Sequence, residues 1–165
     1  MKTFTQVHVA ISLIAIASGL VVMVGLLTRN RLDRWTALFL LFTVATSLTG
    51  FFFPFHGFTP AIGVGIISML VLALAIFARY GRHLAGAWRW IYVITAMVAL
   101  YLNVFVLIVQ CFQKISILKA LAPTQSEPPF LFTQLIALTL FIVLTIVAAI
   151  RKGGFEGNEV STTSR

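Results

Sequence analysis

Five long apolar runs constrain this chain more than any other feature of its sequence. They extend from His8 to Leu27, Trp35 to Phe53, Ala61 to Arg79, Arg89 to Phe112 and Phe130 to Ile150. An α-helix rises about 1.5 Å per residue, so a run of roughly 20 apolar residues crosses about 30 Å of hydrocarbon. A helix also satisfies its backbone hydrogen bonds internally, as lipid requires. The pattern predicts an all-α membrane protein, a bundle of five transmembrane helices.

Composition supports a bilayer as the solvent. Of the 165 residues, 60% are hydrophobic and 10% are charged, whereas water-soluble domains are roughly 45–50% apolar and about 25% charged. The net charge of +8 would suit nucleic acid only if the basic residues gathered on one exposed face, and here they lie in short gaps between apolar runs. The expected partners are therefore the lipid bilayer and a membrane protein or second copy of this chain, with no nucleic acid.

The basic residues also predict an orientation, because cytoplasmic loops are enriched in Lys and Arg. One predicted side holds Arg29, Arg31, Arg34, Arg79, Arg82, Arg89, Arg151 and Lys152, and the other holds Lys2, Lys114 and Lys119. We therefore expect the N-terminus to lie outside and the C-terminus inside. Residues 1–152 are expected to form the transmembrane domain, and the polar, glycine-rich residues 153–165 a disordered cytoplasmic tail.

Three of the runs carry stripes of small or polar residues at helical spacing. The stripes are Thr36, Thr43, Ser47 and Gly50; Ala61, Gly65, Ser68 and Ala75; and Tyr92, Ala96, Ala99, Asn103, Val106 and Gln110. Small residues let helices approach closely in lipid. Two interpretations of Asn103 and Gln110 stay open. They either form hydrogen bonds between helices, or line a polar pocket that opens outward near Gln134.

The predicted topology brings polar residues from separate parts of the chain to the outer boundary. The candidate ligand-binding residues are His8, His56, Asn103, Gln110, Glu127 and Gln134. Two imidazoles with Glu127 could ligate haem or a metal ion. However, the histidines are isolated, and His56 lies between two prolines in "GFFFPFHGFTPAIG", a turn signal. No cofactor or metal is therefore predicted, and haem or quinone remains the alternative.

Catalysis and ion pumping are disfavoured by the same sequence. No Asp, Glu, Lys or Arg lies deep inside a run, and no pair of carboxylates is spaced for acid and base chemistry. The single cysteine, Cys111, excludes an internal disulfide. The segment "LAPTQSEPPF" is interpreted as a stiff connector that follows a short surface helix, or as a cover in which Gln125 and Glu127 fold over the outer mouth.

The segments "GFFFPFHGF", "RHLAGAWRWIYV", "YLNVFVLIVQ" and "LAPTQSEPPF" together resemble a group of small, uncharacterised bacterial inner-membrane proteins. The resemblance extends over nearly the whole chain apart from the tail. It implies a multi-pass protein of the bacterial cytoplasmic membrane and brings no activity with it. The first functional interpretation is a non-catalytic accessory or assembly subunit or a small-ligand binder. The alternative is a small transporter or a redox-linked protein that binds quinone or haem through the outward polar residues.

Overall fold

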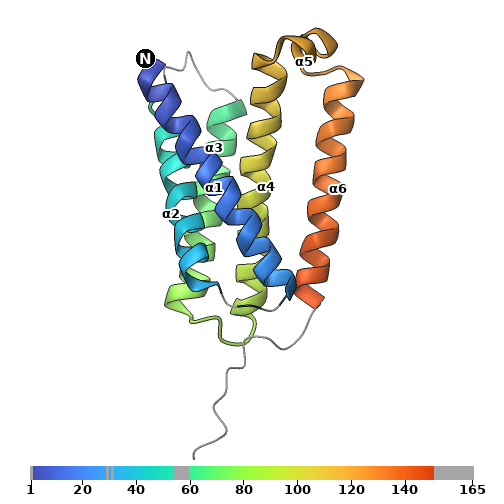
Figure 1. Ribbon diagram of the computed structural model, residues 1–165. Helices are drawn as coiled ribbons and strands as arrows, with labels where there is room; N and C mark the ends of the chain where they lie inside the picture. Colours follow the sequence, from blue (N-terminus) through green and yellow to red (C-terminus); the bar gives the residue numbers. More distant parts are fainter. Residues whose placement is uncertain (1, 29, 31, 54–59, 151–165) are drawn as a thin grey trace, which may run out of the picture.

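The computed structural model describes residues 2–28, 30, 32–53 and 60–150. Within these ranges the elements are α1 (Lys2–Thr28), α2 (Asp33–Gly50), α3 (Pro60–Ile76), the π-helical turn η1 (Phe77–Gly81), α4 (Trp88–Lys114), α5 (Ser116–Leu121) and α6 (Pro128–Ile150). The long helices run up and down beside one another, and short α5 lies across the top (Figure 1). The predicted all-α architecture is confirmed. His56 and the tail, residues 153–165, lie outside the described residues.

Within the described ranges, four segments are long and apolar enough to cross a membrane. They are Thr3–Thr28, Ile62–Gly81, Trp88–Lys114 and Pro128–Ile150. This finding supports the multi-pass membrane character that the sequence predicts. Helix α2 is shorter and begins with Asp33 and Arg34. The carboxylate of Asp33 suits that position because the N-terminus of a helix carries partial positive charge.

Several helix boundaries differ from the predicted runs, and α2 ends at Gly50 rather than at Phe53. Helix α1 begins at Lys2 rather than at His8, and α6 begins at Pro128 rather than at Phe130. Proline is well suited to the first turn of a helix because its missing N–H has no intrahelical acceptor there. Helix α5 lies in the loop between the last two long helices, where the sequence left a short surface helix open.

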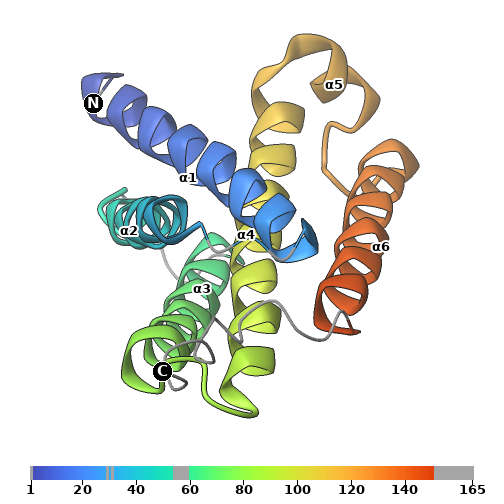
Figure 2. The ribbon, with the colours of Figure 1, turned by 60° about the horizontal axis from the view of Figure 1, so that its bottom comes forward.

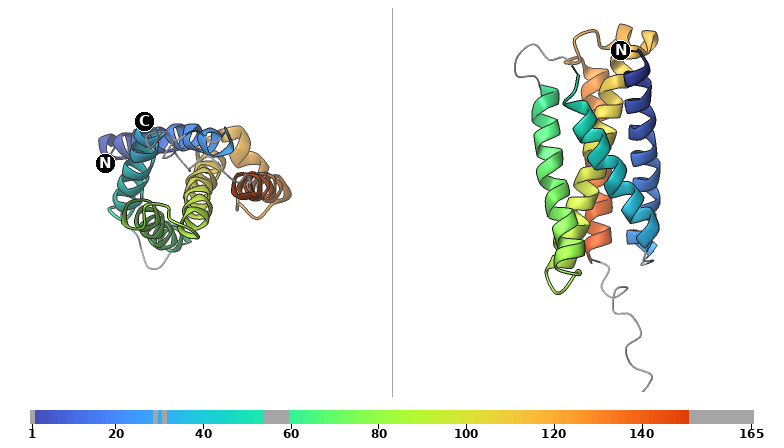
Figure 3. Two further views of the ribbon diagram at one scale, coloured as in Figure 1. Left: turned by 90° about the horizontal axis from the view of Figure 1, so that it is seen from below. Right: turned by 90° about the vertical axis from the view of Figure 1, so that its left-hand side faces the viewer.

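Helices α1 to α4 are arranged in a ring, with α6 outside it (Figure 3, left). Helix α1 packs most extensively on α2, α3 packs on α4, and α6 packs mainly on α4 (Figure 2). One end of the ring carries Arg34, Arg79 and Arg89, which lie at the start of α2, in η1 and at the start of α4. We call it the arginine end. The other is the open end, where α1 begins and α2 and α4 finish.

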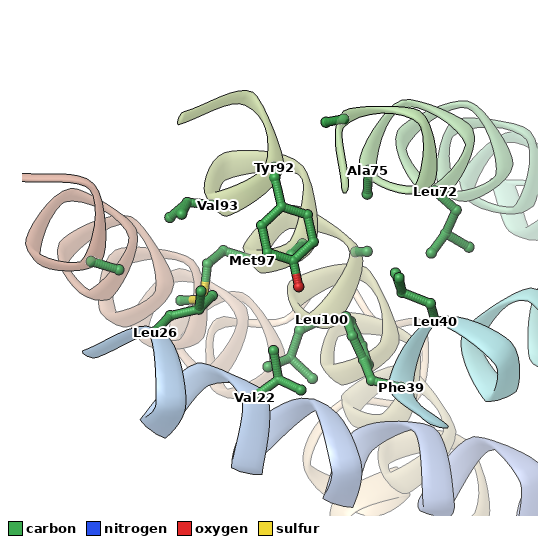
Figure 4. Packing of buried hydrophobic residues seen from close by; sticks show 14 of the residues in the cluster. Val22, Leu26, Phe39, Leu40, Leu72, Ala75, Tyr92, Val93, Met97 and Leu100 are labelled. Atoms are coloured by element: carbon green, nitrogen blue, oxygen red, sulfur yellow. The ribbon is translucent and has the colours of Figure 1, made fainter. Parts of the chain in front are cut away.

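The hydrophobic core lies toward the arginine end. Figure 4 shows side chains of α1, α2, α3 and α4 meeting there: Val22, Leu26, Phe39, Leu40, Leu72, Ala75, Tyr92, Val93, Met97 and Leu100. Tyr92 and Ala75 are completely buried. The predicted stripes supply part of this core, because Thr36, Thr43, Ala96 and Ala99 are buried as well.

Toward the open end, the other described members of these stripes line a shared cavity instead of packing in the core. They are Ser47, Gly50, Gly65, Ser68, Asn103, Val106 and Gln110. The side chain of Ala61, at the start of the third stripe, lies outside the described part of the structure. Each stripe therefore has one half that packs in the core and one half that lines the cavity.

Candidate ligand-binding cavity

A cavity of about 570 Å³ lies between α1, α2, α3 and α4 at the open end of the ring. Most of its wall is apolar, and the apolar lining residues are Val9, Leu13, Ile16, Phe51, Phe53, Ile62, Val64, Val106, Leu107 and Ile115. Its volume falls within the roughly 300–1,000 Å³ of typical small-molecule sites, which combine apolar walls with a few polar groups. The polar groups therefore decide what this cavity can hold.

His8 is held in the wall of the cavity by α2. Its Nδ1 lies 2.7 Å from Oγ1 of Thr49, and its ring packs edge-on against Phe53 with centroids 5.1 Å apart. Lys114, at the end of α4, also lines the cavity and interacts electrostatically with His8. The sequence places His8 at the membrane boundary, and the structure places it at a cavity as well.

Asn103 forms the hydrogen bond between helices that the sequence left open, and it also borders a cavity, although Gln134 does not. Its Nδ2 donates a hydrogen bond to Oγ1 of Thr43, 3.2 Å away, which joins α4 to α2, and the residue also lines the cavity. Gln110 lies two turns further along the same face of α4 and lines the cavity too. Within the described ranges its amide has no hydrogen-bond partner. Gln110 is therefore free to bind a ligand, whereas Asn103 also holds two helices together.

The sequence-based prediction missed several polar lining residues, among them Thr46, Cys111 and Lys114. Among the described residues the hydroxyl of Thr46 is buried without a hydrogen-bond partner. Thr46 lies beside Ser47 in the sequence but outside the predicted stripe. Lys114 lies one helical turn beyond Gln110, and this spacing could have indicated its place on the same face of α4.

Glu127 and Gln134 lie away from the cavity. The Nε2 of Gln134 donates to the backbone oxygen of Phe105, 3.3 Å away, which joins α6 to α4. The carboxylate of Glu127 accepts hydrogen bonds from the backbone N–H of Thr124 at 3.0 Å, the hydroxyl of Thr124 at 2.8 Å and the backbone N–H of Ser126 at 3.1 Å. Desolvation raises the pKa of Glu127, but these hydrogen bonds outweigh it and hold the pKa below its usual value. Glu127 thus stabilises its own connector.

The structure therefore brings together His8, Asn103 and Gln110 from the predicted set. Among the described residues no group of three His, Cys, Asp or Glu side chains could hold a metal ion. The described lining residues include one lysine and no Asp or Glu. What remains is an apolar cavity with hydrogen-bonding groups and one positive charge at its open end, an arrangement suited to binding an amphipathic molecule. Comparison of the chain with protein-family models, curated proteins and solved structures finds no match.

Proposed function

We propose that this protein is a non-catalytic membrane protein that binds a small amphipathic ligand in the cavity between α1, α2, α3 and α4. The observation that carries the proposal is the cavity itself, with a volume of about 570 Å³ and largely apolar walls. An apolar ligand body would contact the walls, and a polar group would meet His8, Gln110 and Lys114. The described lining residues include no carboxylate that could orient His8 as a general base toward Cys111.

The proposed topology has five crossings, with α2 as the fifth membrane-spanning helix, in the bacterial cytoplasmic membrane. The arginine end would face the cytoplasm, because basic residues concentrate there. The N-terminus and the mouth of the cavity would then face outward. An amphipathic ligand could reach the cavity from the outer leaflet or from the periplasm under this topology.

Cysteine labelling in cells tests the orientation. Cys111 is the single cysteine, so a Cys111→Ser background accepts one new thiol at an exposed loop position. We expect Lys119→Cys to react with a membrane-impermeant maleimide in intact cells, and Arg82→Cys to react only after the cells are permeabilised. Both positions are exposed on the protein surface, so burial in the protein would explain neither result. The opposite pattern would reverse the proposed topology.

Cys111 itself reports on ligand binding, because its thiol is partly exposed and borders the cavity. We expect amphiphiles such as long-chain alcohols and quinols to slow maleimide labelling of Cys111 in protein reconstituted into nanodiscs. Val106→Trp would fill the cavity with an indole and abolish this protection. Ile94→Trp is the matched control, because Ile94 is exposed on the same helix and does not line the cavity. Equal protection in the two tryptophan variants would contradict the proposal.

The alternative function, a small transporter or a redox-linked protein that binds quinone or haem, uses the same cavity. The presence of His8 in the wall favours it, because neutral imidazole is a common haem ligand. Protein purified from haem-sufficient cells would then show a Soret band that His8→Phe removes. Purified protein without this band would leave amphiphile binding as the function.

A further inference from the structure

The hydrogen bonds around His8 define which ring nitrogen carries its hydrogen. Oγ1 of Thr49 lies 2.7 Å from Nδ1 of His8 and 2.7 Å from the backbone oxygen of Ala45. A hydroxyl has one hydrogen to donate, and a carbonyl oxygen can only accept. The contact with Ala45 therefore takes the hydrogen of Thr49, and Nδ1 of His8 must donate to Thr49. In neutral imidazole this assignment leaves Nε2 as a hydrogen-bond acceptor.

Nε2 is the ring nitrogen that the contact with Thr49 leaves available, and His8 lines the cavity. Gly50 lines the cavity too and has no side chain that could cover the ring beside Cε1, the atom bonded to both nitrogens. Within the described part of the chain no hydrogen bond reaches Nε2. The edge-on contact with Phe53 and the hydrogen bond to Thr49 together restrict rotation of the ring. The acceptor is thus fixed before a ligand binds.

Two other polar groups at this end of the cavity can donate hydrogen bonds. Lys114 contributes an ammonium group, and one helical turn below it Gln110 contributes an amide. The ammonium offers three N–H groups, and the amide offers two N–H groups and a carbonyl oxygen that accepts. A ligand therefore meets the fixed acceptor of His8 and several donors at the open end, above the apolar walls formed by residues such as Leu13 and Ile16.

A hydroxyl group matches this arrangement, because it can donate to Nε2 of His8 and accept from Gln110 or Lys114 at the same time. A carboxylate, a quinone carbonyl or an ether oxygen can only accept, and would leave Nε2 unpaired. Building on the binding function proposed above, we infer that the ligand is an apolar molecule with a hydroxyl at its polar end, of which a membrane quinol is representative. Its hydroxyl donates to His8 and its apolar part lies against the walls.

Protection of Cys111 from maleimide tests this inference with matched pairs of probes. One pair is a short-chain ubiquinol and its dimethyl ether, kept anaerobic, and the other is a long-chain alcohol and its methyl ether, which removes any redox difference. We expect each hydroxyl compound to protect Cys111 at a concentration roughly three- to tenfold lower than its ether, the difference that one net hydrogen bond supplies. Oxidised ubiquinone has no hydroxyl to donate to His8, so it should protect Cys111 no better than the ether does.

Two substitutions of His8 sharpen the result. His8→Phe keeps an aromatic ring beside Phe53 but removes both nitrogens, and should abolish the preference for the hydroxyl compound. His8→Gln places an amide oxygen at the level of Nε2 and should restore part of the preference. The rate of Cys111 labelling without any probe reports in each variant whether the cavity remains intact.

The outcomes separate the two proposals. If hydroxyl compounds and ethers protect Cys111 equally, or if His8→Phe retains the preference, the inference about the hydroxyl is overturned and the cavity remains a binding site. If no amphiphile protects Cys111 in the unaltered protein, the proposed binding function fails together with it. A hydroxyl preference that His8→Phe abolishes and His8→Gln restores supports both.

Discussion

Gly19→Leu is expected to prevent α1 from packing against α2 and α4. A Cβ atom at Gly19 would lie 2.5 Å from Cδ1 of Leu100 and 2.9 Å from Cδ2 of Phe39. Both side chains are 1% exposed, so neither has free space into which it could move. Overpacking a core by a few methylene groups costs typically about 1–3 kcal/mol. A leucine adds a whole branched side chain at a point without room, and we expect a loss of at least about 3 kcal/mol of unfolding free energy.

The measurement is reversible unfolding of the purified protein in mixed micelles by increasing amounts of dodecyl sulfate. Gly19→Ala should be intermediate, because it adds only the Cβ atom. Gly50→Ala is the control, since its Cβ atom would meet nothing closer than Cε1 of His8 at 3.9 Å, an ordinary contact. If Gly19→Leu unfolds at the same detergent fraction as Gly50→Ala, the close crossing of α1 with α2 and α4 does not exist in solution.

The faces that α2, α3 and α4 turn toward the ring could be predicted from sequence because each carries a stripe of small and polar residues. Thr43, Ala75 and Tyr92 are buried as members of those stripes. Helix α1 carries a shorter series of the same kind, which the prediction missed. Its buried residues include Ala15 and Ser18, but leucines, isoleucines and valines cover most of the helix and make the series less distinct.

The cavity could not be predicted from these patterns. It exists because α1 and α4 diverge toward the open end, and a crossing angle depends on how ridges of side chains interdigitate along a whole interface. His8, Asn103 and Gln110 were predicted as residues of the outer boundary, but only their depth in the membrane follows from topology. Gln134 fits the predicted depth, yet it lies on α6 and bonds to Phe105 on α4. Depth alone does not fix the direction in which a side chain points around the bundle.

Glu127 was grouped with His8 because both were expected near one boundary. Its carboxylate is instead occupied by the backbone and hydroxyl groups of Thr124 and Ser126. Short polar side chains and carboxylates commonly form such local hydrogen bonds in turns. The sequence "TQSE" contains the residues needed for this local arrangement, so its polar pattern encodes a turn rather than a distant ligand site.

Arg79→Ala is expected to destabilise the arginine end by about 2–3 kcal/mol, through the loss of a desolvated cation–π contact and an ion pair. The guanidinium carbon of Arg79 lies 5.3 Å from the centroid of the Tyr92 ring, and Arg79 forms an ion pair with Asp33. The side chain of Arg79 is only 9% exposed, whereas that of Asp33 is 71% exposed. Because the aromatic contact is buried and the carboxylate is solvated, we expect Tyr92 to account for most of the loss.

Two matched variants separate these contributions in the same unfolding assay. Arg82 also lies over an aromatic ring, 5.3 Å from the centroid of Trp88, but it is exposed, so Arg82→Ala should cost about 1 kcal/mol or less. Asp33→Ala removes the ion pair and leaves the contact between Arg79 and Tyr92, and should also cost about 1 kcal/mol or less. If Asp33→Ala proves as damaging as Arg79→Ala, the ion pair to α2 and not the buried contact with Tyr92 of α4 accounts for the stabilisation by Arg79. The expected order, with Arg79→Ala clearly less stable than the other two variants, would assign this stabilisation to burial of the guanidinium against α4.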